Sequence, residues 1–211
     1  MCSALGLRPV AAIVMVAGIL TTTPTYASVV YRLEIFTDNG AYHDDPDVLL
    51  LVAVSEESGL ARFDVSNEST IPCVISGVYF EQGLLESLDS LIDGPGTSFS
   101  WPAHPRRLPA GQMLDPPFVN WFSAGAGSPA PTNGINPDET LTLRFNLAQG
   151  VGMDEVYGHF NSAEYRIGAH LIALPDGSSE SASTMPEPTT LALLLGPAMV
   201  ALGWRPGKRR R

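Results

Sequence analysis

The chain has 211 residues, of which 45% are hydrophobic and 16% are charged, and its formal net charge is −10. This length suits one folded domain together with processing segments. Residues 28–185 hold six basic and 21 acidic residues, so this part carries a formal charge of −15, which argues against a nucleic-acid partner.

Residues 1–27 have the pattern of a secretory signal peptide. Arg8 supplies positive charge, residues 9–20 are a short apolar run, and a small-x-small cleavage site ends at Ala27. The predicted mature chain therefore begins at Ser28, after export through Sec-type machinery. The alternative is a retained membrane anchor, although the apolar run is short for a span of about 20 residues.

Short strand signals dominate residues 28–175, which we expect to form one ectodomain. The segments with strand-like patterns are 29–36, 48–54, 60–66, 71–80, 117–122, 140–147 and 164–174. Residues with turn propensity, such as Asp-Asn-Gly at 38–40, separate them. Many short strands with frequent turns predict a mainly β fold, an antiparallel β-sandwich of jelly-roll-like or Ig-like type.

Helix is expected only in one or two short segments of this domain. Residues 153–161 carry acidic side chains in the first turn, which suits a helix N-terminus. Val156, Tyr157 and Phe160 would then face the core. Residues 84–92 have leucines at helical spacing, but they fit a strand equally well.

The sequence predicts that the mature chain has no intramolecular disulfide. Cys2 lies in the predicted signal peptide, so Cys73 stands alone in the mature chain. Export permits disulfides, but this domain has no second cysteine with which to form one. The apolar neighbours of Cys73 predict a buried, inert thiol.

The C-terminal part of the chain has three elements in order after a polar segment. Residues 176–184 are small and polar, which predicts a flexible linker. A Pro-Glu-Pro triplet follows within residues 185–211, then an uncharged apolar helix over 189–204 and a basic end. The triplet is Pro186, Glu187 and Pro188, and the basic residues are Arg205, Lys208, Arg209, Arg210 and Arg211.

These three elements together resemble the PEP-CTERM sorting domain of exported proteins from Gram-negative bacteria. The resemblance covers residues 185–211, with Pro197 inside the apolar segment as a departure from the pattern. It implies transient membrane anchoring, removal of the tail by an exosortase-like membrane enzyme, and delivery to the cell surface or the extracellular space. It also implies an association with exopolysaccharide and biofilm. The alternative is an ordinary C-terminal anchor that stays uncleaved.

The ectodomain is also similar to a recurrent type of PEP-CTERM ectodomain. The segments that carry this looser resemblance are 63–67, 75–80, 133–137, 166–170 and 176–181. It implies a β-rich extracellular module without an assigned chemistry.

An acidic loop is the candidate metal site. Asp38, Asp44, Asp45 and Asp47 lie within ten residues of one another, together with His43. Carboxylate and carbonyl oxygens are the ligands that calcium prefers, although the spacing is not that of an EF-hand. The alternatives are a solvated acidic hairpin and a transition metal at His43.

Aromatic residues in or near loops are candidates for binding sugar rings. They are Tyr42, Trp101, Phe118, Trp121 and Phe122. Aromatic faces can stack on sugars, but the same side chains can also fill a core.

No catalytic motif occurs in the sequence, and the four histidines have no close zinc spacing. We therefore expect a noncatalytic exported surface or matrix protein without a cofactor. One alternative is a secreted carbohydrate-active hydrolase, whose two carboxylates would meet only in the fold. The other is a calcium-stabilised adhesin module.

Overall fold

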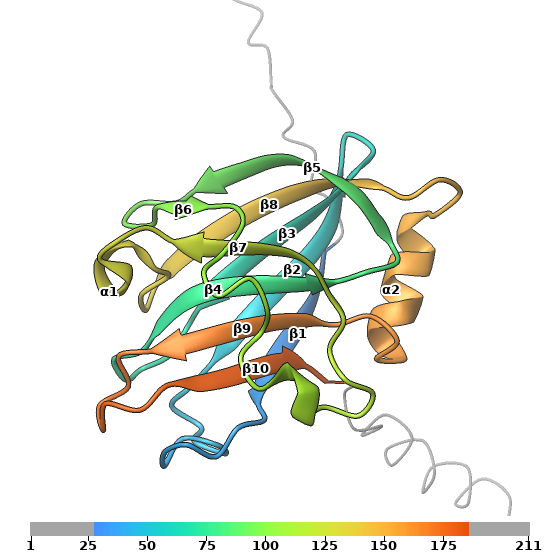
Figure 1. The fold of residues 1–211 in the computed structure, drawn as a ribbon. Helices are drawn as coiled ribbons and strands as arrows, with labels where there is room; N and C mark the ends of the chain where they lie inside the picture. Colours follow the sequence, from blue (N-terminus) through green and yellow to red (C-terminus); the bar gives the residue numbers. More distant parts are fainter. Residues whose placement is uncertain (1–27, 186–211) are drawn as a thin grey trace, which may run out of the picture.

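The structure is a computed structural model that describes residues 28–185 (Figure 1). The predicted signal peptide, the Pro-Glu-Pro triplet, the apolar C-terminal helix and the basic end lie outside the described residues. The strands are β1 Ser28–Ile35, β2 Leu50–Glu57, β3 Leu60–Asn67, β4 Val74–Glu81, β5 Leu85–Asp93, β6 Phe99–Ser100, β7 Asn120–Ala126, β8 Glu139–Leu147, β9 Ile167–Ile172 and β10 Glu180–Thr184. The helices are η1 Gly111–Met113, α1 Ala130–Asn133 and α2 Met153–Asn161.

The ten strands form one antiparallel sheet in the order β5-β8-β3-β2-β1-β10-β9-β4-β7-β6, and this sheet is nearly closed into a barrel. The mainly β, antiparallel fold with two short α-helices is as expected from the sequence. The sheet differs from the expected two-sheet sandwich in being continuous. Strand β1 pairs with β2 on one side and with β10 on the other, which joins the two halves of the sheet.

The hairpin between β2 and β3 shows how local sequence fixes the register of the strands. Glu57 pairs with Leu60, so only Ser58 and Gly59 form the turn. Both have positive φ, at 56° and 82°, which is the conformation of a type I′ turn. The turn sets the pairing that places Phe63 and Val65 on the buried face.

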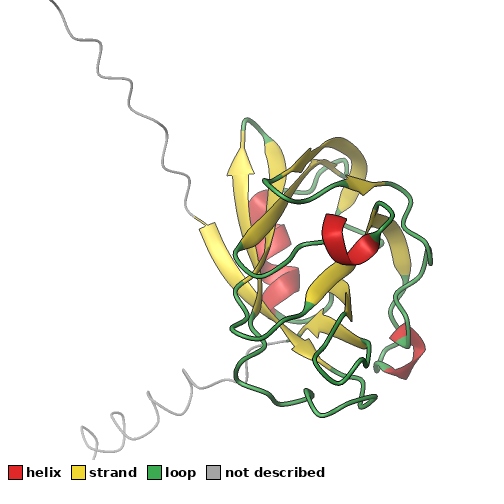
Figure 2. Ribbon diagram, turned by 90° about the vertical axis from the view of Figure 1, so that its left-hand side faces the viewer, coloured by secondary structure: helices red, strands yellow, loops and turns green. Residues whose placement is uncertain are grey.

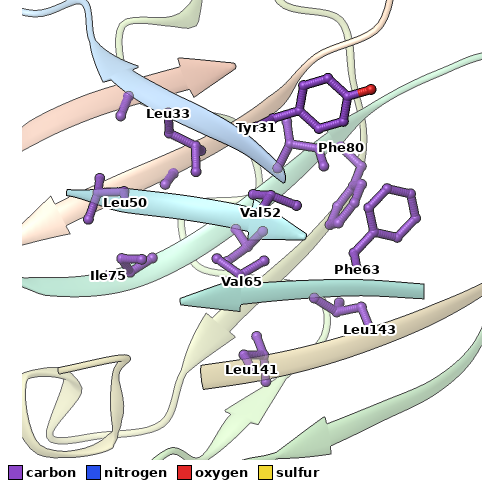
Figure 3. Packing of buried hydrophobic residues seen from close by; sticks show 14 of the residues in the cluster. Tyr31, Leu33, Leu50, Val52, Phe63, Val65, Ile75, Phe80, Leu141 and Leu143 are labelled. Carbon is purple, nitrogen blue, oxygen red and sulfur yellow. The ribbon is translucent and has the colours of Figure 1, made fainter. Parts of the chain in front are cut away.

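The core lies inside the curled sheet. Phe80 of β4 contacts Phe63 of β3, with ring centroids 5.2 Å apart, and Phe145 of β8, at 4.9 Å. These strands are far apart in the sheet order, so the contacts require the sheet to curl until its halves face each other. Side chains from both halves point into this common core (Figure 3), and the turned view shows strands on both sides of the molecule (Figure 2).

Helix α2 confirms the helix predicted for residues 153–161. Val156 and Phe160 are buried, whereas Tyr157 is only partly buried. Phe160 stacks on Tyr31 of β1 with ring centroids 5.0 Å apart. The helix lies beside the ends of the strands (Figure 1), and its buried residues Val156 and Phe160 belong to the main core cluster. Within residues 28–185, no helix has both the length and the apolar character that crossing a membrane requires.

Strand β10 corrects the prediction of a flexible linker over residues 176–184. Residues 180–184 are all buried in the middle of the sheet, between β1 and β9. Two of the strand's hydroxyl groups form hydrogen bonds within the protein: Thr184 Oγ1 accepts from Ile167 N at 3.0 Å, and Ser183 Oγ donates to Thr184 O at 3.3 Å. Small polar side chains therefore occupy a tightly packed strand, which their composition alone does not reveal.

Three further elements refine the prediction. Residues 84–92, which fitted helix and strand equally, belong mainly to strand β5. The strand predicted at 117–122 lies later, as β7. Cys73 is buried and free, as predicted.

Candidate functional site: a cavity at the seam of the barrel

The barrel is left open between its two edge strands, β5 and β6, which follow each other in the chain. Phe99 N of β6 donates a hydrogen bond to Asp93 Oδ1 of β5, at 2.8 Å, and this links the two edges at one point. Strand β6 has only two residues and pairs with Gly125 and Ala126 at the end of β7. Among residues 28–185, no strand pairs with the rest of this β7 edge, and we call the opening between β5 and β7 the seam.

The segment after β6 runs along the unpaired edge of β7. Ala103 N donates to Ser123 O at 3.1 Å. Farther on, the Asn120 side-chain Nδ2 donates to Arg106 O at 2.9 Å. These bonds hold residues 101–107 beside the seam.

A β-bulge places Trp121 at the seam. Phe80 of β4 pairs with Phe122, and the next residue, Glu81, pairs with Asn120, so Trp121 is an extra residue in β7. A bulge of this kind bends the strand and changes the direction of the extra side chain. Trp121 approaches Phe145 of β8 across the seam, with ring centroids 6.1 Å apart.

The seam holds a cavity of about 610 Å³. Its lining residues are Ser87, Leu88, Trp101, Pro102, Arg106, Arg107, Asn120, Trp121, Phe122 and Ser123. Trp101 is 64% exposed, whereas Phe122 is buried behind it, with ring centroids 6.3 Å apart. The cavity therefore has aromatic walls that reach from the solvent to the core.

The charge of this cavity is opposite to that of the domain. Arg106 and Arg107 are both exposed, and no carboxylate is among the described residues that line the cavity. The other four arginines of residues 28–185 form ion pairs with carboxylates. These pairs are Arg32 with Glu34, Arg62 with Glu57 and Asp64, Arg144 with Glu57, and Arg166 with Glu81. Arg106 and Arg107 make no ion pair with any described residue, so both charges remain available to a ligand.

The structure brings three of the five candidate aromatic residues together and separates the other two. Trp101, Trp121 and Phe122 share the seam cavity. Phe118 lies elsewhere, with the guanidinium of Arg166 5.7 Å from its ring centroid. Tyr42 packs against the main core.

The acidic loop does not assemble a metal site in the described part of the chain. Asp45 Oδ1 accepts a hydrogen bond from Asp47 N, and Asp47 Oδ1 accepts one from Thr70, both at 2.9 Å. The side chain of Asp44 is 94% exposed. Residues 28–185 contain no group of three or more His, Cys, Asp or Glu side chains that could hold a metal ion. Calcium binding at Asp38, Asp44, Asp45 and Asp47 stays a prediction that this geometry does not favour.

Comparison with known protein families, with curated proteins and with solved structures gives no match for this chain.

The arginine pair and the bulge are the parts of the site that the sequence reasoning missed. Arg106 and Arg107 stand next to each other in residues 28–185, a part of the chain with only four other basic residues. That contrast is a usable signal, because a pair of adjacent basic residues in an acidic domain can attract an anionic ligand. No sequence pattern identifies Trp121 as the bulged residue.

Proposed function

We propose that this protein is a noncatalytic exported surface or matrix protein that binds exopolysaccharide through the seam cavity. The observation that carries this proposal is the cavity itself, in which Trp101 and Trp121 stand beside the unpaired Arg106 and Arg107. In this proposal, the open seam of the nearly closed barrel is the binding site.

The chemistry of the lining suits a sugar. Aromatic faces bury the apolar faces of sugar rings, and an exposed ring such as Trp101 is available without rearrangement. Binding sites of this type combine apolar walls with a few fixed polar groups. Asn120 is one such group, since its bond to Arg106 O holds its amide beside the cavity.

The proposed route to the surface rests on the two ends of the chain. The predicted cleavage after Ala27 and the Pro-Glu-Pro triplet at 186–188 bracket the folded domain. Export by Sec-type machinery, transient anchoring and release by an exosortase-like enzyme would place the seam cavity in the extracellular matrix. Strand β10 ends at Thr184, two residues before Pro186, so little chain separates the barrel from the sorting motif.

Two other functions compete with this proposal. A carbohydrate-active hydrolase usually needs two carboxylates at its cleft, and the described lining of the seam cavity offers none. An adhesin module stabilised by calcium would melt at a higher temperature when calcium is added, because a ligand that binds only the folded state raises its stability.

The proposal is tested in the native host by where the protein is found and what it accompanies. Protein recovered from culture fluid and membranes is analysed by intact mass and by cosedimentation with the isolated exopolysaccharide. We expect a form that begins near Ser28, ends near residues 186–188 and cosediments with the polysaccharide, whereas the Trp101→Ala variant stays in the supernatant. A membrane-bound form that retains Arg211 would contradict the sorting part. Reducing ends released from the polysaccharide would support the hydrolase instead.

A further inference from the structure

We infer that the seam cavity selects saccharides that carry carboxylate groups, such as uronic acid residues, over neutral ones. This inference rests on the proposed function and adds the chemical class of the ligand. It is carried by the contrast between the acidic domain and the two arginines that line the seam cavity.

The domain places its basic residues unevenly. Residues 28–185 have six arginines and 21 acidic residues, so most arginines find carboxylate partners within the fold. Arg62, for example, contacts both Asp64 and Glu57. Arg106 and Arg107 are the exceptions, and both lie at the lining of one cavity. Two like charges on neighbouring residues repel each other, and an anion placed between them relieves that repulsion.

A carboxylate fits this pair better than a neutral hydroxyl does. The guanidinium group is a planar fork of donors that matches the two oxygens of a carboxylate, and such charge-assisted bonds are stronger than neutral ones. No carboxylate of the described lining competes for these donors. The neighbouring ring of Trp101 offers a stacking surface for the sugar that bears the acid.

The net charge of the domain opposes any long anionic polymer, but this effect is weak for a short ligand. Charges farther away than about 8 Å are largely screened at physiological ionic strength. A short acidic oligosaccharide held at the seam therefore responds mainly to Arg106 and Arg107. The test below uses short oligosaccharides for this reason.

The test compares two forms of one ligand. Purified full-length protein is titrated by calorimetry with a galacturonate oligosaccharide and with its methyl ester, in which each carboxylate has lost its charge and gained a methyl group. We expect the free acid to bind about tenfold more tightly than the ester. The Arg106→Gln and Arg107→Gln double variant should bind both forms with the affinity of the ester. Arg32→Gln, which alters an arginine of β1 that pairs with Glu34, is the control and should keep the preference.

The outcomes separate this inference from the proposed function. Equal affinity for acid and ester, with both lost in Trp101→Ala, would overturn the acid selectivity and keep sugar binding at the seam. A preference that survives in the double arginine variant would overturn the role of the pair. Binding of the acid that is unaffected by Trp101→Ala would reveal a general anion patch and overturn both. No binding of either form to folded protein would also count against both.

Discussion

Glu81 and Arg166 form an ion pair that is almost completely excluded from solvent. Arg166 Nη2 lies 2.7 Å from Glu81 Oε1, and the two side chains are 5% and 8% exposed. Glu81 also accepts hydrogen bonds from the backbone N–H groups of Val119 and Arg166, both at 3.0 Å. This one carboxylate thus ties the end of β4 to the segments that lead into β7 and β9.

Removing one member of this pair should strongly destabilise the fold. Arg166→Met leaves the Glu81 carboxylate buried without its countercharge, and the expected loss is ~3–5 kcal/mol in the free energy of unfolding. Urea titration followed by circular dichroism measures it. Arg32→Met is the control, because the pair of Arg32 with Glu34 is about half exposed and should contribute below ~1 kcal/mol. Similar losses in the free energy of unfolding for both variants would show that the buried ion pair contributes no more than the exposed one.

Strand β10 makes residues 180–184, just before the Pro-Glu-Pro triplet, part of the folded domain. Glu180 is 1% exposed, and its carboxylate accepts hydrogen bonds from Thr37 Oγ1 and Asn39 N. A chain that ends after Ser179 loses the strand between β1 and β9, so we expect no cooperative thermal unfolding. A chain that ends after Met185 should melt like the full-length protein. If the chain that ends at Ser179 still folds, residues 180–184 are not required for the fold, and the prediction of a linker stands.

His170 should make stability depend on pH below neutrality. Burial lowers the pKa of His170 from its usual value of 6.5, and its Nδ1 lies 3.1 Å from Ser76 Oγ. Because the unfolded chain then takes up the proton more readily, the contribution of His170 is complete above about pH 6.5 and declines as the pH falls below that value. His170→Gln should flatten this part of the profile.

The measurement for His170 is the free energy of unfolding between pH 7.5 and 5 for the wild type and the variant. His104→Gln, on an exposed loop, controls for the loss of a histidine. A wild-type profile that keeps its slope in His170→Gln would assign the pH dependence to other groups.

Two glycine substitutions compare a tightly packed position with an open one. A Cβ on Gly94, in the turn between β5 and β6, would overlap the carbonyl oxygen of Thr140, so Gly94→Ala should cost ~1–3 kcal/mol. Gly158 is exposed in α2, with no atom within 4 Å of the added Cβ. Gly158→Ala should therefore stabilise the protein by ~0.5–1 kcal/mol. Melting temperatures that move in the same direction for both variants would contradict this packing.

Local patterns were sufficient to predict the elements whose side chains alternate or repeat. Strand β3 alternates apolar and polar residues, and α2 places Val156 and Phe160 on one face. These patterns reflect burial of one face, which acts within a single element. Most strands and the antiparallel β class follow from them.

The same patterns could not predict β10 or the continuous sheet. All five residues of β10 are buried although three are serine or threonine, and they form hydrogen bonds with distant residues: Ser181 N donates to Thr37 Oγ1, and Ile167 N donates to Thr184 Oγ1. Whether ten strands form one sheet or two depends on the pairing of β1 with β10, whose partner residues lie about 150 positions apart. Such pairing is a property of the whole chain.

The aromatic residues of the candidate site were predictable from the sequence, but their arrangement and the arginine pair were not. Loop aromatics pointed to sugar stacking, yet only the fold shows that Trp101 and Trp121 share a cavity while Phe118 does not. The bulge at Trp121 depends on the pairing of β7 with β4. The predicted signal peptide and sorting tail, by contrast, rest on linear motifs, which can be identified without knowledge of the fold.

The most direct test of the account is a calorimetric titration of the full-length protein with exopolysaccharide fragments isolated from its own host. We predict saturable binding that Trp101→Ala weakens by at least about tenfold while the melting temperature stays unchanged, because Trp101 is exposed and carries little of the core. Binding of equal strength by the wild type and Trp101→Ala, or no heat of binding by folded wild-type protein, would contradict the claim that the seam of the barrel is a saccharide site.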